Sequence, residues 1–274
     1  MDDLLRVTTD FRLDDVDAAA TPGFDAGKSE GKEALAVAEH QLSQRQERLF
    51  AASKGGETRR VLLVLQAMDT AGKGGIVRHV VGAVDPQGVR LTAFKKPTAE
   101  ELAHHFLWRI EQRLPEPGMI GVFDRSHYED VLIGRVRQLA PVDEIEGRYA
   151  EIRDFERRVV DGGTAIVKVM LHISSGEQKE RLRERLDRPD KHWKYNPGDI
   201  DERRLWPEYQ AAYQLAIERT HADHAPWYVV PADHKWYARL AVQTLLLGAL
   251  EAIDPQWPVA DFDVEVEKQR LAAS

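Results

Sequence analysis

The sequence contains no cysteine, so it can form no disulfide framework and can offer no thiolate as a nucleophile or metal ligand. No apolar run approaches the ~20 residues that a membrane-spanning helix needs. The first residues, Met1-Asp2-Asp3-Leu4, lack the basic start and the apolar core of a signal peptide. We therefore expect a cytoplasmic protein with no membrane partner.

Basic residues are fewer than acidic residues in this sequence. The chain has 38 Lys and Arg residues against 46 Asp and Glu residues, which gives a net charge of −8. This balance provides no general attraction to nucleic acid, and we predict no nucleic-acid partner. A polyanionic ligand would have to find a local track of basic side chains. The sequence further lacks a zinc motif, a nucleophile elbow and the G-x-G-x-x-G dinucleotide fingerprint.

Apolar runs and amphipathic segments alternate along the chain. They predict strands at 61–65, 89–94, 118–123, 164–173 and 227–230, and helices at 33–52, 142–161, 176–187, 201–221 and 235–252. Two more helices are expected, one from the loop after the first strand to about Val84 and one capped by Thr98. The alternation favours an α/β fold with a five-stranded, mainly parallel sheet. The length suits a single domain over 1–274, in which residues 1–32 form an extended arm.

A Gly- and Lys-rich turn, Gln66–Gly75, follows the first predicted strand. Its composition is typical of a phosphate-binding loop, because glycines let backbone N–H groups approach a phosphate and Lys73 adds a mobile positive charge. The phosphate contacts expected from this loop are Ala71, Gly72, Gly74 and Gly75. The loop departs from G-x-x-x-x-G-K-[ST], with Ala67 in place of the first glycine and Gly74 in place of the hydroxyl residue. The alternative is an ordinary strand-to-helix turn with a solvated lysine.

Two acidic residues are candidates for a magnesium site. Asp69 lies inside the loop and can replace the missing hydroxyl ligand, and Asp124 follows the third predicted strand. In open parallel sheets, ligands bind beyond the carboxyl ends of the strands, so both carboxylates should face one crevice. Arg125 could neutralise charge on a transferring phosphoryl group. The predicted catalytic residues are thus Asp69, Lys73, Asp124 and Arg125. The alternative for Asp124 is a helix cap just past a strand.

Cations are dense in the segment 179–194. Arg181, Arg185 and Arg188 are spaced by three and four residues and could share one helix face. A mobile lid over about 176–200 would place them above the crevice and exclude water. Further phosphate contacts are expected from Lys191, Lys194, Lys95 and Lys96. An exposed, solvated charged helix is the alternative for this segment.

These motifs resemble the polyphosphate kinase 2 family, particularly its short single-domain members. The resemblance extends over about residues 20–253 and rests on Gln66–Gly75, Phe123–Leu132, Lys191-His192-Trp193-Lys194 and Ala225–Asp233. It implies a thymidylate-kinase-like P-loop core, a three-layer αβα sandwich with a helical lid. It also implies Mg²⁺-dependent transfer of the terminal phosphate of inorganic polyphosphate to a nucleotide, by a homo-oligomer (a dimer or tetramer). Asp69 and Lys73 match the family's loop residues, and Asp124-Arg125 match its strand-end pair.

The resemblance also suggests where the nucleotide binds. Tyr128, Glu129 and Asp130 belong to a tail that is similar to members accepting both nucleoside mono- and diphosphates, and Arg135 lies further along. Asp124 and Gly74 look more like the subfamily that uses diphosphates, so AMP, ADP and GDP are all possible acceptors. Two other functions stay open. They are an ATP-dependent nucleoside monophosphate kinase on the same core and a non-catalytic module that senses phosphate or nucleotide.

Overall fold

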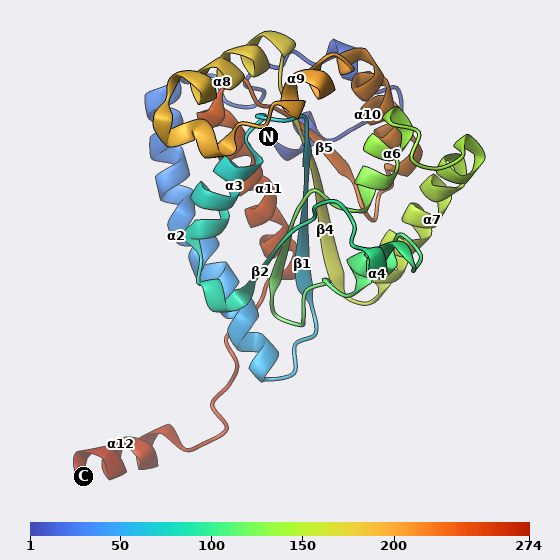
Figure 1. Ribbon diagram of the computed structural model, residues 1–274. Coiled ribbons are helices and arrows are strands. Elements are labelled where there is room, and N and C mark those ends of the chain that lie inside the picture. The colour runs from blue at the N-terminus through green and yellow to red at the C-terminus, as the bar shows by residue number, and fades with distance from the viewer.

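Five parallel strands form the centre of the computed structural model, which describes residues 1–274 (Figure 1). They are β1 (Arg60–Ala67), β2 (Val89–Ala93), β3 (Ile120–Asp124), β4 (Thr164–His172) and β5 (Trp227–Pro231), in the spatial order β2-β3-β1-β4-β5. Every neighbouring pair is parallel. The central strands β1 and β4 are buried along almost their whole length, because helices cover both faces of the sheet. The predicted α/β fold with a parallel sheet is confirmed.

Helices form a layer on each side of the sheet. The helices are α1 (Asp2–Leu5), α2 (Lys28–Lys54), α3 (Lys73–His79), α4 (Ala99–Leu102), α5 (Trp108–Glu111), α6 (Ile133–Val136), α7 (Val142–Asp161), α8 (Ser175–Asp187), α9 (Gly198–Arg203), α10 (Trp206–Thr220), α11 (Lys235–Ile253) and α12 (Val264–Ala272). In Figure 1, α2, α3 and α11 lie on one side of the sheet and α6, α7 and α10 on the other. Helices α8 and α9 lie over one end of the sheet, above the loop that follows β1.

Several predicted boundaries change in the structure. The helix predicted to reach Val84 ends at His79 and continues as a 3₁₀ turn. The segment 201–221 is two helices, because Pro207 lies in the first turn of α10 and marks a new start. The capping box of Thr98 and Glu101 is present, but its helix has only four residues. Helices α5, α6 and α12 were not predicted.

The N-terminal arm is attached to the body of the fold. It contains α1 and a 3₁₀ turn at Leu13–Asp15, and its Leu5, Val7 and Leu13 side chains are buried. Arg6 bridges to Tyr228 in β5. The arm is therefore partly helical and not wholly extended, and it covers β5, which protects that edge of the sheet. None of the helices is long and apolar enough to cross a membrane.

The strand register determines where the candidate residues meet. Leu65 in β1 lies opposite Asp124, the last residue of β3. The loop after β1 and the turn after β3 therefore begin side by side at the carboxyl edge of the sheet, as predicted from the parallel pattern.

Candidate active site

The β1–α3 loop is shaped by backbone conformations that suit anion binding. Gly72 has φ +122, a value that strains any residue with a side chain, and Thr70 is left-handed with φ 64. Gly72 caps α3, and Lys73 is the first residue of that helix. The Lys73 ammonium donates to the backbone carbonyl of Ala67 at 2.9 Å, so its side chain folds back over the loop.

The charges around Lys73 come from both strand ends. Burial lowers the pKa of Lys73, as does Arg125, while the nearby carboxylates Asp69, Asp124 and Glu129 oppose the shift. All four predicted catalytic residues therefore lie close enough to act on one another electrostatically. A weakly solvated ammonium of this kind gains more from a bound phosphate than a fully hydrated one does.

Arg125 links the two loops. Its guanidinium lies 3.3 Å from Asp69 Oδ1 and 3.8 Å from Glu129 Oε2. Arg125 is itself left-handed, with φ 64, a conformation that costs a non-glycine residue free energy and is found where the surroundings enforce it. Burial raises the pKa of Glu129, although Arg125 and Lys73 oppose that shift.

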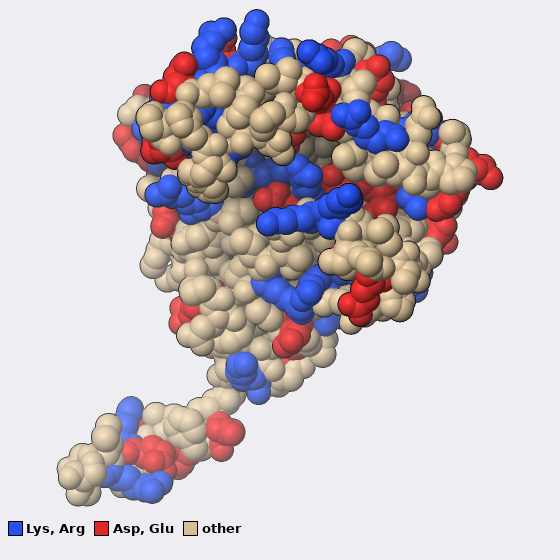
Figure 2. Space-filling model, viewed as in Figure 1, with Lys and Arg blue, Asp and Glu red and all other residues tan.

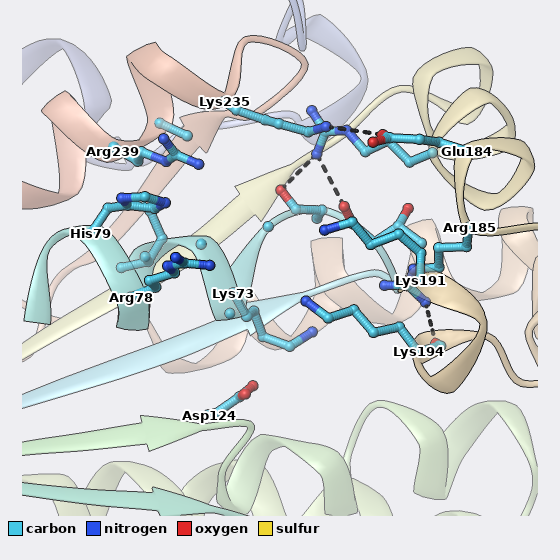
Figure 3. Close-up of a pocket in the computed structure, with 18 residues that line it drawn as sticks. Lys73, Arg78, His79, Asp124, Glu184, Arg185, Lys191, Lys194, Lys235 and Arg239 are labelled. Carbon is cyan, nitrogen blue, oxygen red and sulfur yellow. Dashed lines mark hydrogen bonds and ion pairs between the residues drawn. The ribbon is translucent and has the colours of Figure 1, made fainter. Parts of the chain in front are cut away.

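A cation-rich cavity of about 370 Å³ lies between the loop and α8. Its basic lining residues are Lys73, Arg78, His79, Arg181, Arg185, Lys191, Lys194, Lys235 and Arg239, and its acidic ones are Asp124 and Glu184. Figure 3 shows that Arg78, His79 and Arg239 border one side and that Arg185, Lys191 and Lys194 border the other. Figure 2 shows Lys and Arg side chains in the central hollow of the surface, below α8 and the segment that follows it. We call this the cationic cavity.

A second cavity of about 250 Å³ lies under α9 and α10. Asp69, Arg125 and Glu129 line it from the strand ends, and Asn196, Asp199, Glu202, Arg203, Tyr209 and Tyr213 line it from the lid side. It contains apolar walls, two aromatic rings and charges of both signs, which is the usual lining of a site for a polar organic ligand. We call this the mixed cavity.

Comparisons with known proteins identify the family at this point. Residues 26–258 match the family model described as "Polyphosphate kinase 2 (PPK2)". The chain belongs to the polyphosphate kinase 2 family.

Two relatives and one solved structure show how close the similarity is. The chain is 47% identical over 248 residues to the AMP/ADP-polyphosphate phosphotransferase of Meiothermus ruber, covering 90% of this chain and 91% of the relative. It is 41% identical over 247 residues to the ADP-polyphosphate phosphotransferase of Rhodopseudomonas palustris, with 86% and 84% covered. The crystal structure of polyphosphate kinase 2 from Arthrobacter aurescens superposes with a TM-score of 0.97 at 58% identity, covering 99% of this chain and 96% of that one.

The structure divides the predicted magnesium pair between the two cavities. Asp124 lines the cationic cavity, and Asp69 lines the mixed cavity. Lys73 lines the cationic cavity, and both carboxylates act on its pKa. The two acids therefore line different cavities and not the single crevice that the sequence predicted, although both lie close enough to Lys73 to act on it.

Of the four predicted nucleotide contacts, Tyr128 is wrong as a direct contact, whereas Asp130 and Arg135 lie outside both cavities and stay predictions. Tyr128 is completely buried, Asp130 pairs with Arg109 and Arg148, and Arg135 pairs with Glu146 on α7. None of them lines either cavity, because the turn after Arg125 directs only one of its side chains, that of Glu129, toward the mixed cavity.

The predicted lid residues have different environments. Arg185, Lys191 and Lys194 line the cationic cavity. Arg181 also borders it but is only 5% exposed, and its guanidinium donates to the carbonyls of Thr70, Ala71, Ala232 and Asp233 at 2.6–3.0 Å. Arg181 therefore fastens α8 to the loop. Arg188 pairs with Glu184 and Asp190 and lies outside both cavities.

Some residues that line the two cavities were not predicted from the sequence, and two of the predicted phosphate contacts lie elsewhere. Lys95 and Lys96 line neither cavity, because β2 is an edge strand two positions away from β1. Lys235 and Arg239 on α11 do line the cationic cavity, and their four-residue spacing on one helix was a usable signal. Tyr209 and Tyr213 on α10 have the same spacing, but an aromatic pair of this kind is more often core.

Proposed function

We propose that this protein is a phosphotransferase that moves the terminal phosphate of inorganic polyphosphate to a nucleoside mono- or diphosphate. The observation that carries the proposal is that Lys73, which lines the cationic cavity, lies within electrostatic reach of Asp69, Arg125 and Glu129, which line the mixed cavity. The names of the relatives, AMP/ADP- and ADP-polyphosphate phosphotransferase, support it. A donor and an acceptor can thus approach the same ammonium from two sides.

The cationic cavity suits polyphosphate as the donor. Eight Lys and Arg residues line it against two acids, although the whole chain carries a net charge of −8. Polyphosphate presents only phosphate oxygens, so it offers nothing for apolar walls, and only three of the 18 lining residues are hydrophobic. Ammonium and guanidinium groups form the strongest hydrogen bonds to such oxygens.

The mixed cavity suits the acceptor nucleotide. Arg125 at its inner end can pair with the acceptor phosphate, and the Tyr209 and Tyr213 rings offer apolar surface to the nucleoside. Glu202 accepts a hydrogen bond from the Tyr209 hydroxyl at 2.5 Å, which fixes that ring at the wall of the cavity. A nucleotide held here would direct its terminal phosphate toward Lys73.

The chemistry needs position and charge more than a nucleophilic side chain. During transfer, negative charge spreads over the oxygens of the moving phosphoryl group. Lys73 and Arg125, together with the loop amides, would stabilise that charge. The lid cations Arg185, Lys191 and Lys194 would neutralise the rest of the donor chain and keep water out.

We further propose that Asp69 and Asp124 hold Mg²⁺ with the substrate phosphates. No group of three or more His, Cys, Asp or Glu side chains is arranged to hold a metal by itself. Mg²⁺ does not require such a group, since it commonly binds through one or two carboxylates, waters and substrate phosphates. Two carboxylates that both lie near Lys73 fit this donor set, and the ion would neutralise phosphate charge when bound.

The experiment is a product assay with the purified protein and Mg²⁺. Polyphosphate is supplied with AMP, ADP, GMP and GDP separately, and ATP is supplied with AMP and GMP in parallel. We expect polyphosphate to yield nucleoside di- or triphosphate from at least AMP or ADP. Turnover with ATP and a monophosphate but none with polyphosphate would favour the ATP-dependent kinase instead.

A sensing module without catalysis is the weaker alternative. Binding an anion gains nothing from carboxylates placed beside it, whereas a metal-dependent transfer does. The cytoplasmic location and the homo-oligomeric state expected from the sequence stay predictions.

A further inference from the structure

A network of charged and polar side chains is buried behind the mixed cavity. Lys168 on β4, Glu156 on α7 and Tyr128 after β3 are at most 1% exposed. The Lys168 ammonium donates to Glu156 Oε2 at 2.6 Å, to the Tyr128 hydroxyl at 3.0 Å and to the Thr220 carbonyl at 2.8 Å. The Tyr128 hydroxyl donates to Glu156 Oε1 at 2.7 Å.

The network joins five elements of the fold. The Thr220 hydroxyl, at the end of α10, lies 3.0 Å from the Tyr128 hydroxyl and accepts from the Trp227 indole of β5 at 2.9 Å. His127 Nε2 lies 3.2 Å from Glu156 Oε1. Burial would raise the pKa of Glu156, but the charge of Lys168 and the hydrogen bond from His127 lower it below its usual value. The partners of Glu156 therefore favour its ionised form.

A gain in folding stability is not a sufficient explanation for this buried network. Removing two charges from water costs several kcal/mol per ion in a protein interior, and apolar residues of similar volume often replace a buried pair without loss. The ring of hydrogen bonds does, however, fix each partner in one place. A role in positioning is consistent with both facts.

The residues anchored by the network belong to the turn that carries site residues. His127 and Tyr128 point into the network, whereas Arg125 before them and Glu129 after them face the mixed cavity. From the other side, Gln66 of β1 lies against Ser126 and Glu129. With its amide oxygen turned toward Ser126, Gln66 accepts from the Ser126 backbone N–H at 3.1 Å and donates to Glu129 Oε1 at 3.0 Å. The turn is thus held from both sides, with the strained Arg125 at its start.

We propose that the Tyr128–Glu156–Lys168 network positions Arg125 and Glu129 for the acceptor nucleotide. Tyr128, Glu156 and Lys168 are positioning residues, since none of them lines either cavity. The inference rests on the proposed function only for the identity of the ligand in the mixed cavity. Displacement of the turn would disturb that cavity and leave the cationic cavity, formed by α3, α8 and α11, as it is.

The test measures binding of two ligands separately to Tyr128→Phe and Glu156→Gln. Calorimetry with ADP and with polyphosphate gives both dissociation constants without turnover. We expect ADP binding to weaken by about tenfold in each variant, the size typical of an indirect coupling, and polyphosphate binding to stay within about twofold of the unsubstituted protein. In the double variant the loss should not exceed that of the larger single variant, because both changes break one network.

Tyr149→Phe provides the matched control, because Tyr149 is also buried against this side of the sheet but lies outside the network. It should leave ADP binding unchanged. Unchanged ADP binding in folded Tyr128→Phe, or an equal loss for both ligands, would overturn the positioning role. If the unsubstituted protein binds ADP but does not use polyphosphate, the proposed function fails, while the ADP measurements still decide this inference. If it binds no ADP, the inference fails as well.

Discussion

At the residue scale, the site depends on a few charges placed at the ends of two neighbouring strands. Asp69 and Asp124 act on the same lysine, and Arg125 bridges Asp69 and Glu129. Each of these side chains follows a buried strand directly or within a few residues. These residues could be predicted from the sequence because the carboxyl ends of parallel strands lie along one edge of the sheet, where ligands bind.

Replacing Asp124 by Asn tests the magnesium proposal. The substitution keeps the size of the side chain but removes the charge that Mg²⁺ prefers. We expect turnover to fall on the order of a hundredfold and the Mg²⁺ concentration for half-maximal rate to rise. The measurement is the rate of nucleotide phosphorylation across a Mg²⁺ titration.

Asp154→Asn is the control for this titration, since Asp154 is an exposed residue of α7 that lines neither cavity. It should behave like the unsubstituted protein. An Asp124→Asn variant with the same rate and the same Mg²⁺ dependence would exclude Asp124 from the metal site.

Glu129 should make the protein less stable as the pH rises. Burial raises the pKa of Glu129 above the 4.5 of a free glutamate, so the folded state favours the protonated form. Its contribution to stability is fully present below pH 4.5 and is lost as the pH rises through the folded pKa. We therefore expect Glu129→Gln to increase the melting temperature relative to the unsubstituted protein, by an amount that grows from pH 4.5 toward neutrality.

Thermal unfolding of both proteins over that pH range checks the prediction. The difference between them isolates Glu129, because all other titrating groups are common to both. A difference that is constant with pH, or that shrinks toward neutrality, would show that Arg125 and Lys73 outweigh burial at this position.

Tyr128 shows where residue-level prediction fails. In the sequence it stands beside Glu129 and looked equally available to a nucleotide. In the structure the short 3₁₀ turn His127–Asp130 sends neighbouring side chains to opposite sides, so Tyr128 enters the core and Glu129 reaches the cavity. A turn has no regular period from which these directions could be calculated.

At the scale of elements, the quality of the prediction follows the length and regularity of each segment. The helix 142–161 was predicted with the boundaries it has, because six apolar residues recur along it at helical spacing, and all of them except the first, Val142, are buried. The four-residue helices α5 and α6 gave no such signal. Helices this short form only through tertiary packing, which a local pattern does not contain.

The lid contains cations that line the cationic cavity and cations that pair with acidic residues of the lid. Lys191 lines the cationic cavity, whereas Arg188 is paired with acids of the lid itself. We expect Lys191→Gln to raise the KM for polyphosphate by about tenfold, because one charged contact with phosphate is lost. Arg188→Gln should change that KM by less than about twofold, and neither should alter the KM for nucleotide.

Steady-state kinetics with each substrate varied in turn provides this comparison within one segment. Equal effects of the two substitutions would mean that the lid contributes only general positive charge. A larger effect of Arg188→Gln would contradict the assignment of the lining residues.

At the scale of the whole molecule, net charge and local charge have opposite signs. The chain carries a net charge of −8, yet one cavity gathers eight Lys and Arg side chains from α3, the lid and α11. Polyphosphate binding should therefore depend on local cations and on the release of its counterions. We expect its affinity to weaken on the order of ten- to a hundredfold between about 50 and about 200 mM salt.

Polyphosphate titrations at increasing salt test this expectation, with ADP binding as the internal comparison. ADP brings fewer phosphates and should show a shallower dependence. A polyphosphate affinity that does not respond to salt would contradict binding in the cationic cavity.

The arrangement of the whole fold was only partly predictable. The alternation of strands and helices gave the parallel sheet and the common edge of the site, but not the order β2-β3-β1-β4-β5. That order decides which loops meet, and it brings the turn after β3 beside the loop after β1 while leaving Lys95 and Lys96 outside both cavities. The contribution of α11 to the cationic cavity likewise depends on packing between segments that are distant in sequence.

The most direct test of the account follows the transferred phosphate itself. Radiolabelled polyphosphate is mixed with unlabelled ADP or AMP and excess enzyme for a single turnover, and the nucleotides are separated. We predict that the label appears in the terminal phosphate of the nucleotide product. Unlabelled nucleotide from a protein that does turn over ATP with a monophosphate would contradict the assignment of polyphosphate as the donor.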